Sequence, residues 1–237
     1  MAIDTALMQN IYCDKTYLHL NPTWHEEDSS WKADQVLRML DRHQLAPSSI
    51  ADIGCGAGAI LARLHHALPG AEYHGFDIAP PAIALAKQQQ SPHLQFHAED
   101  LLQRDDVFDL LLVIDVVEHV PDYLQFLAGC REKARHKIYH IPLDIHVSSV
   151  LRASFVRGRK TIGHIHYFTA ESAFDALKDT GHTIIDWFYT NGAVELARLR
   201  PSLKRTLANV PRRVIGSMSR AWAARLLGGY SLLVLAE

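Results

Sequence analysis

The chain has 237 residues, of which 48% are hydrophobic and 21% charged, and its formal net charge is −2. This length and composition are typical of one large globular domain with a substantial core. The cysteines Cys13, Cys55 and Cys130 are odd in number and widely spaced, and no apolar signal-type segment follows Met1, so we expect a reducing, cytoplasmic location and exclude a disulfide framework or a paired-cysteine zinc site.

The first segment, about residues 1–45, mixes aromatic, basic and acidic residues before a helix that the apolar spacing predicts over 31–42. Two interpretations stay open for it. It closes over a bound ligand as a lid to which Trp24, Trp31 and Lys32 contribute, or it is a helix anchored by buried tryptophan.

An apolar strand predicted over 49–53 leads into a glycine-rich turn and then a helix over 59–68. The turn contains Gly54, Gly56 and Gly58, so its backbone can pass very close to a ligand. Asp77 ends the next strand, 72–77, where a carboxylate can accept both ribose hydroxyls of a nucleoside. The pattern predicts a nucleoside site, and a tight turn without a ligand is the alternative.

The spacing of the glycines indicates which nucleoside binds. Dinucleotide enzymes use G-x-G-x-x-G, whereas this chain has G-x-G-x-G. Asp52 stands two residues before the first glycine, where its charge would repel a pyrophosphate but would suit an ammonium or sulfonium group. S-adenosylmethionine carries both of these cations.

At these residues the chain resembles the class I S-adenosylmethionine-dependent methyltransferases, over roughly residues 31–190. In that family the glycine loop lies under the amino-acid end of the cofactor, the acid of the second strand holds the ribose, and an acid after the third strand meets the adenine. The resemblance assigns cofactor binding to Asp52, Gly54, Cys55, Gly56, Gly58, Asp77, Ile78, Glu99, Asp100, Leu101 and Asp115. Asp100 is the expected adenine contact.

A further resemblance covers the residues after the fourth predicted strand, 108–114. The segment from Asp115 to Asp122 resembles that of the ubiquinone-pathway O-methyltransferases, in which two acids and a histidine gather near the acceptor. The resemblance implies a divalent cation, magnesium or calcium, held by Asp115, Glu118 and His119, although oxygen-rich magnesium sites seldom include imidazole. The alternative is that Glu118 and His119 order the loop without a metal.

Histidines are frequent around and after the fifth predicted strand, 137–141. Transfer to a hydroxyl oxygen needs a base that removes the proton, and a histidine serves this purpose near neutral pH. We expect the base among His119, His146 and His164, and the sequence does not choose between them. Hydrogen-bonding histidines without a catalytic role are the alternative.

The last part of the chain is predicted to contain a helix over 171–179, strands over 183–189 and 230–235, and between them a basic insertion of about residues 191–229. From Leu196 to Gly229 there are eight basic residues and no acid. An apolar stripe at helical spacing is formed by Ile215, Met218, Trp222 and Leu226. Pro201, Pro211 and Gly216 are expected to break the region into short pieces.

Such a basic amphipathic helix lies on an anionic membrane surface or binds an acidic partner, or its stripe simply packs onto the domain. We therefore keep peripheral contact of 196–229 with the inner membrane surface as one expectation. Nucleic acid is not expected as a partner, because Asp115-Val116-Val117-Glu118 stands where amino-methylating DNA enzymes carry an aromatic-proline motif.

The alternation of strands and helices predicts an α/β fold with a parallel sheet. The resemblance implies a Rossmann-like sheet of seven strands, one of them antiparallel, with helices on both faces, as a single domain over 1–237. The leading functional hypothesis is methyl transfer from S-adenosylmethionine to a small-molecule or lipid-linked acceptor, at a hydroxyl oxygen. The alternative is a protein that binds S-adenosylmethionine without turnover and recruits a partner or membrane through the basic helix.

Overall fold

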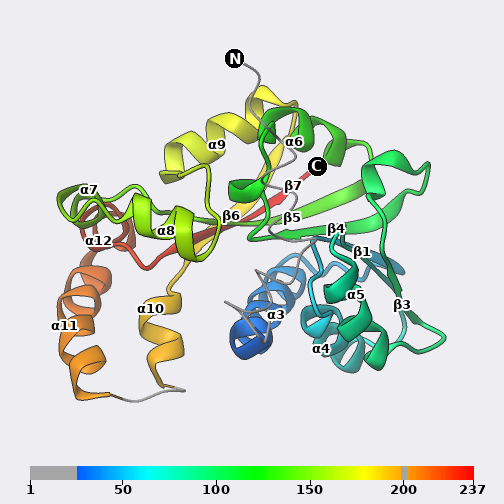
Figure 1. The fold of residues 1–237 in the computed structure, drawn as a ribbon, viewed down its shortest axis with the longest axis horizontal. Helices are drawn as coiled ribbons and strands as arrows, with labels where there is room; N and C mark the ends of the chain where they lie inside the picture. Colours follow the sequence, from blue (N-terminus) through cyan, green and yellow to red (C-terminus); the bar gives the residue numbers. More distant parts are fainter. Residues whose placement is uncertain (1–25, 199–201) are drawn as a thin grey trace. The chain divides into compact units, whose positions relative to one another are not determined.

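The computed structural model describes residues 26–198 and 202–237 (Figure 1). Of the predicted lid, Trp24 lies outside the described residues, as do Arg200 and Pro201 of the basic segment. The chain divides into two compact units, Met1–Ile114 with Gly129–Ile138 (unit 1) and Asp115–Ala128 with Tyr139–Glu237 (unit 2). The single domain expected over 1–237 stays a prediction.

The seven strands have the order β3-β2-β1-β4-β5-β7-β6, and the predicted fold class is confirmed. In unit 1, β1 pairs in parallel with both β2 and β4, and β2 pairs in parallel with β3. The bounds are β1 Ser49–Ile53, β2 Glu72–Phe76, β3 Leu94–His97 and β4 Phe108–Ile114, and β5 Ala134–Pro142 begins in unit 1 and ends in unit 2. Strands β1 and β4 are buried along nearly their whole length, because a parallel sheet is covered on both faces.

The helices of unit 1 bury one apolar face each. In α3 (Glu26–Arg42) that face consists of Ala33, Val36, Met39 and Leu40, all at most 3% exposed. Helix α3 packs beside α4 (Ala59–Ala67), as Figure 1 shows. The remaining elements are α5 Pro80–Ala86, the 3₁₀ turns η1 Lys87–Gln89 and η2 Leu101–Gln103, and α6 Tyr123–Arg131, which starts in unit 2.

Unit 2 contains the antiparallel pair of β6 (Ile184–Thr190) and β7 (Ser231–Ala236). Its helices are η3 Val117–His119, α7 Val147–Leu151, α8 Phe155–Thr161, α9 Ala170–Asp179, α10 Gly192–Glu195, η4 Leu196–Arg198, α11 Leu203–Met218 and α12 Arg220–Leu227. Thr169 caps α9 at its start, and Gly181 follows the end of the helix with a φ of 85°. Among the described residues, no helix has the length and apolarity needed to cross a bilayer.

The basic segment differs from the prediction. Helix α11 runs without a break through Pro211 and Gly216, and ends only where Ser219, in an extended conformation, caps α12. A proline in a helix has no N–H to donate to the carbonyl four residues earlier. For Pro211 this carbonyl belongs to Leu207, which is an exposed residue. The predicted stripe from Ile215 to Leu226 is therefore split between two helices.

Candidate functional site

The glycine turn after β1 takes a path that only glycine follows without strain. The φ angles of Gly54, Gly56 and Gly58 are 72°, 55° and 81°. A Cβ on Gly58 would lie 2.5 Å from the ring of Phe96, so no side chain fits there. The turn then enters α4, and its exposed backbone can approach a ligand closely.

Asp77, directly after β2, ties this turn to the neighbouring strand. Its Oδ2 accepts the N–H of Gly56 at 2.9 Å, and its Oδ1 accepts the N–H of Ala79 at 2.8 Å. Burial raises the pKa of the Asp77 carboxyl, and these two hydrogen bonds oppose that rise. Each oxygen keeps a second lone pair, so the carboxylate is held ready for a pair of hydroxyl donors.

Asp52 is a buried acid in β1, and its residue is only 1% exposed. Neither carboxylate oxygen has a hydrogen-bond partner within the described part of the chain. Burial, followed by repulsion from Asp77, raises its pKa well above the usual range, and the ammonium group of Lys32 opposes this. Because a buried acid without donors is costly, this position suits a ligand that brings a cationic donor.

The predicted adenine contacts follow β2 and β3. Ile78 leaves an apolar side chain 49% exposed beside Asp77, as a ligand contact requires. Asp100 caps η2 by accepting the N–H of Leu102 at 2.9 Å, and Leu101 is buried. Glu99 instead pairs with Arg104 at 2.5 Å, so Asp100 is the more available of the two acids.

The Cys55 side chain packs inward. The Cys55 sulfur lies so close to Gly75 of β2 that a Cβ added to this glycine would be 2.8 Å from it. Burial raises the pKa of the Cys55 thiol. Any contact of Cys55 with a cofactor is therefore expected from its backbone.

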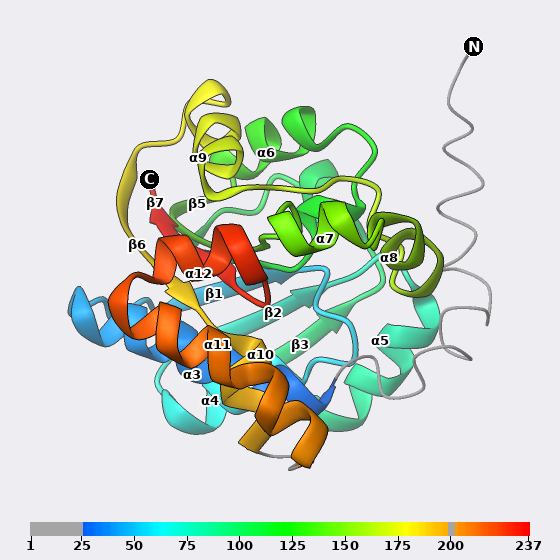
Figure 2. The ribbon, with the colours of Figure 1, turned by 90° about the vertical axis from the view of Figure 1, so that its left-hand side faces the viewer.

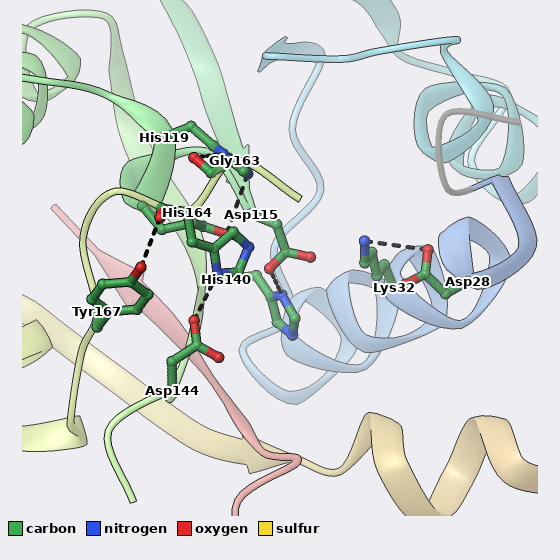
Figure 3. A network of polar contacts seen from close by, with 10 residues as sticks. Asp28, Lys32, Asp115, His119, His140, Asp144, Gly163, His164 and Tyr167 are labelled. Carbon is green, nitrogen blue, oxygen red and sulfur yellow. Dashed lines mark hydrogen bonds and ion pairs between the residues drawn. The ribbon is translucent and has the colours of Figure 1, made fainter. Parts of the chain in front are cut away.

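In unit 2, Asp115 directly follows β4 and has a left-handed conformation with φ 55°, which is uncommon for a residue other than glycine. His140 of β5 holds it, because its Nδ1 lies 2.6 Å from Asp115 Oδ1 (Figure 3). The other ring nitrogen, Nε2, lies 2.9 Å from Thr190 Oγ1. A carboxylate accepts only, so Nδ1 carries the proton and Nε2 accepts from the Thr190 hydroxyl. The role of Asp115 in cofactor binding stays a prediction.

Beyond η3, two imidazole rings turn the same nitrogen toward one buried carboxylate. The Nε2 atoms of His119 and His164 lie 3.9 and 3.8 Å from Glu118 Oε1. Each ring is fixed through its Nδ1, which in His119 is 3.1 Å from the carbonyl of Gly163 and in His164 is 2.6 Å from Asp144 Oδ2 (Figure 3). These acceptors place the proton on Nδ1 and leave Nε2 as the basic nitrogen.

The metal site predicted from Asp115, Glu118 and His119 is not the group that the structure forms. The ligand atoms that converge, all within 4.8 Å of one another, belong to Glu118, His119 and His164, whereas the Asp115 carboxylate is bonded to His140. A set with two imidazoles suits zinc or a similar ion better than magnesium or calcium, which prefer oxygen. The residues present therefore do not fit the cation that the sequence predicted.

His146 has a local structural role. Its Nδ1 accepts the backbone N–H of Ser149 at 3.0 Å, and it forms the N-cap of α7 in a reciprocal capping box. Burial lowers the pKa of His146, which keeps the accepting nitrogen unprotonated. The accepting nitrogen of His146 thus serves the helix, and a role of His146 as the base stays a prediction.

Asp144 and Thr190 were absent from the predicted site residues. Asp144 follows β5 in the loop that leads to His146, so the position of a carboxylate just after a parallel strand was the signal that could have found it. Thr190 ends β6, far along the chain from His140, and the sequence carries no signal for their contact.

Residues 51–136 match the protein family described as a methyltransferase domain. The ubiquinone biosynthesis O-methyltransferase of Cereibacter sphaeroides is 36% identical over 113 residues, covering 42% of this chain and 44% of that protein. The malonyl-acyl-carrier-protein O-methyltransferase of Bacillus anthracis is 28% identical over 139 residues, covering 56% of this chain and 47% of that protein. The chain thus spans less than half the length of these curated relatives.

The crystal structure of magnesium protoporphyrin IX methyltransferase from Synechocystis PCC 6803 with bound SAH aligns with a TM-score of 0.67 at 16% identity, covering 98% of this chain and 99% of that chain. At this identity the alignment shows the fold. Together with the family match, it confirms the resemblance to the class I S-adenosylmethionine-dependent methyltransferases that was predicted from the sequence.

Proposed function

We propose that the protein transfers the methyl group of S-adenosylmethionine to a hydroxyl oxygen of a small-molecule or lipid-linked acceptor. The observation that carries the proposal is the arrangement in unit 1, where Asp77 is locked to the glycine turn and Asp52 is buried without hydrogen-bond donors from the described chain. Both curated relatives are named as O-methyltransferases, which supports oxygen as the acceptor atom.

In this proposal, different residues of unit 1 bind different parts of the cofactor. Asp77 accepts the two ribose hydroxyls, and the bonds from Gly56 and Ala79 orient its carboxylate beforehand. Ile78, Asp100 and Leu101 receive the adenine. Asp52 faces the ammonium group of the amino-acid end, and the backbone of Gly54, Cys55, Gly56 and Gly58 lies under it.

His164 is the base in this proposal. S-adenosylmethionine supplies a methyl group on a positively charged sulfur, so the protein has only to align the acceptor and remove its proton. The acceptor oxygen forms a bond to the methyl carbon, the carbon–sulfur bond breaks with its electrons going to sulfur, and the hydroxyl proton passes to Nε2 of His164. Asp144 orients the ring, and the Glu118 carboxylate, 3.8 Å away, stabilises the resulting imidazolium.

His119 is the second candidate, since its Nε2 lies at a similar distance from Glu118. Its Nδ1, however, is oriented by the neutral carbonyl of Gly163 rather than by a carboxylate. A hydrogen bond to a carboxylate is stronger than one to a neutral carbonyl, so the ring of His164 is held more firmly, which favours His164.

Calorimetric titration with S-adenosylmethionine and with its demethylated product tests the cofactor site. Wild type is expected to bind both, and Asp77→Ala neither. Turnover is then assayed with aromatic diols and with polyprenyl-linked phenols as acceptors. Binding without turnover of any acceptor would favour the alternative, a non-catalytic cofactor-binding protein, and absence of binding would refute the proposal. A cytoplasmic location stays a prediction.

A further inference from the structure

The outward face of α11 carries a row of apolar side chains that no described residue of unit 2 covers. Its members, here called the α11 stripe, are between 47% and 85% exposed: Leu203, Leu207, Val210, Val214 and Met218. Steps of four, three, four and four residues place them on one side of the helix. A continuous apolar row of this kind marks an interaction surface.

The opposite side of α11 is fixed to the rest of unit 2, so the stripe cannot turn inward. Asn209 is 4% exposed and donates to the carbonyl of Ala193 at 2.6 Å. Arg212 donates to the carbonyls of Leu227 and Gly228 at 3.0 and 2.9 Å, at the end of α12. Helix α11 packs against both α12 and α10, and Figure 2 shows it beneath α12.

Positive charge accompanies the stripe. Arg213, between Val210 and Val214 in the sequence, is exposed, as is Arg220 on α12. No acidic residue occurs between Leu196 and Gly229. Trp222 of α12 is also 57% exposed, and tryptophan is typical of the boundary between headgroups and acyl chains.

We propose that the α11 stripe docks on the surface of a bilayer that contains anionic lipids. The apolar side chains enter the boundary between headgroups and acyl chains, and the arginines meet the lipid phosphates. This surface goes beyond the methyl-transfer proposal and does not depend on it. A second copy of the chain is the weaker occupant, because a symmetric contact through this face would bring like-charged arginines together.

Flotation of the full chain with vesicles tests the proposal. We expect binding to phosphatidylcholine vesicles that contain about one third phosphatidylglycerol, and at least tenfold weaker binding to pure phosphatidylcholine. The double variant Leu207→Ser with Val214→Ser should bind the anionic vesicles about tenfold less. Val107→Ser, which changes a 67% exposed valine of unit 1, is the matched control and should bind like wild type.

Two further variants separate charge from apolar burial. Arg213→Gln with Arg220→Gln should lose the preference for phosphatidylglycerol and the salt sensitivity while keeping the residual binding to neutral vesicles. Cofactor titration of every variant checks that it is folded. Failure of wild type to float, equal binding to neutral vesicles, or a dimer in light scattering that Leu207→Ser abolishes would each overturn the proposal.

Discussion

The carboxylate of Asp144 accepts a hydrogen bond from Nδ1 of His164 at 2.6 Å, which presents the other ring nitrogen as a base. His164→Gln should therefore lower kcat by about 10²–10⁴, the range of general-base catalysis, with little change in cofactor affinity. Asp144→Asn should lower kcat less, because the base remains but its orientation is lost.

The split between kcat and cofactor affinity distinguishes this role from a structural one. Loss of a base lowers kcat alone, whereas loss of a structural residue would also weaken the binding of S-adenosylmethionine. His166→Gln, two residues further on, is the control, because His166 Nε2 bonds only to the carbonyl of Pro121 among the described contacts. A fully active His164→Gln enzyme would exclude His164 and direct attention to His119.

The cluster of Glu118, His119 and His164 makes a second prediction, on metal removal. An imidazole nitrogen that binds a metal cannot also accept the acceptor's proton, so methyl transfer is expected to survive dialysis against a chelator. Activity is measured before and after dialysis, and after adding magnesium, manganese or zinc. Loss of activity that zinc or manganese restores would mean that the cluster is a metal site and not a base.

Asp52→Asn should stabilise the protein without ligand and weaken cofactor binding. Burial raises the pKa of Asp52, so the folded state keeps the proton longer than the unfolded state, whose carboxyl titrates near about 3.9. Wild-type stability is therefore lost as the pH rises from that value through the higher folded pKa. At neutral pH the variant should melt about 2–4 °C higher per kcal/mol of penalty removed.

Although Asp52→Asn should raise the melting temperature of the protein without ligand, it should reduce the stabilisation that the cofactor provides. S-adenosylmethionine should raise the melting temperature of wild type and raise that of Asp52→Asn much less. Asp34→Asn, an exposed acid paired with Arg63 at 3.2 Å, is the control and should change neither value. If Asp52→Asn binds the cofactor as tightly as wild type does, the proposed contact between Asp52 and the ammonium group of S-adenosylmethionine is wrong.

His146 should make the protein sensitive to mild acid. Its pKa is lowered by burial, so as the pH falls below about 6.5 the unfolded ring takes up a proton before the folded one, and stability is lost in that window. His146→Asn, which keeps a cap for α7, should remove this loss, whereas His146→Ala should cost about 1 kcal/mol at neutral pH. Melting curves between about pH 5 and 8 measure both effects. Loss of turnover in His146→Asn would restore His146 as a candidate base.

The cofactor half of the site was predictable from the sequence because its signals are local. The strand, the glycines and the acid follow one another from Ala51 to Asp77. The glycines have the positive φ angles that the turn needs, and Asp77 accepts backbone N–H groups at the end of the next strand. Strands β1, β4 and β7 were predicted to within a few residues for the same reason, since each is a short run dominated by apolar residues.

The histidine cluster was only partly predictable. Glu118 and His119 meet His164 through a loop without periodicity, in which the backbone N–H groups of Ile165 and His166 both donate to the carbonyl of Glu118. No pattern in the chain encodes such a contact. His146 was included as a candidate base because it belongs to the histidines after the fifth predicted strand, and nothing in the sequence indicated that it caps α7. Pro211 was expected to break a helix that continues through it.

The bonds from Gly56 and Ala79 to Asp77 exist before any nucleoside arrives, so this carboxylate needs no rearrangement to hold a ribose. The ribose and adenine are the same in S-adenosylmethionine and in its demethylated product, so contacts with these groups do not distinguish the two molecules. The demethylated product should then remain bound and compete, so that its removal, by release or by another enzyme, would govern how fast the protein works in a cell.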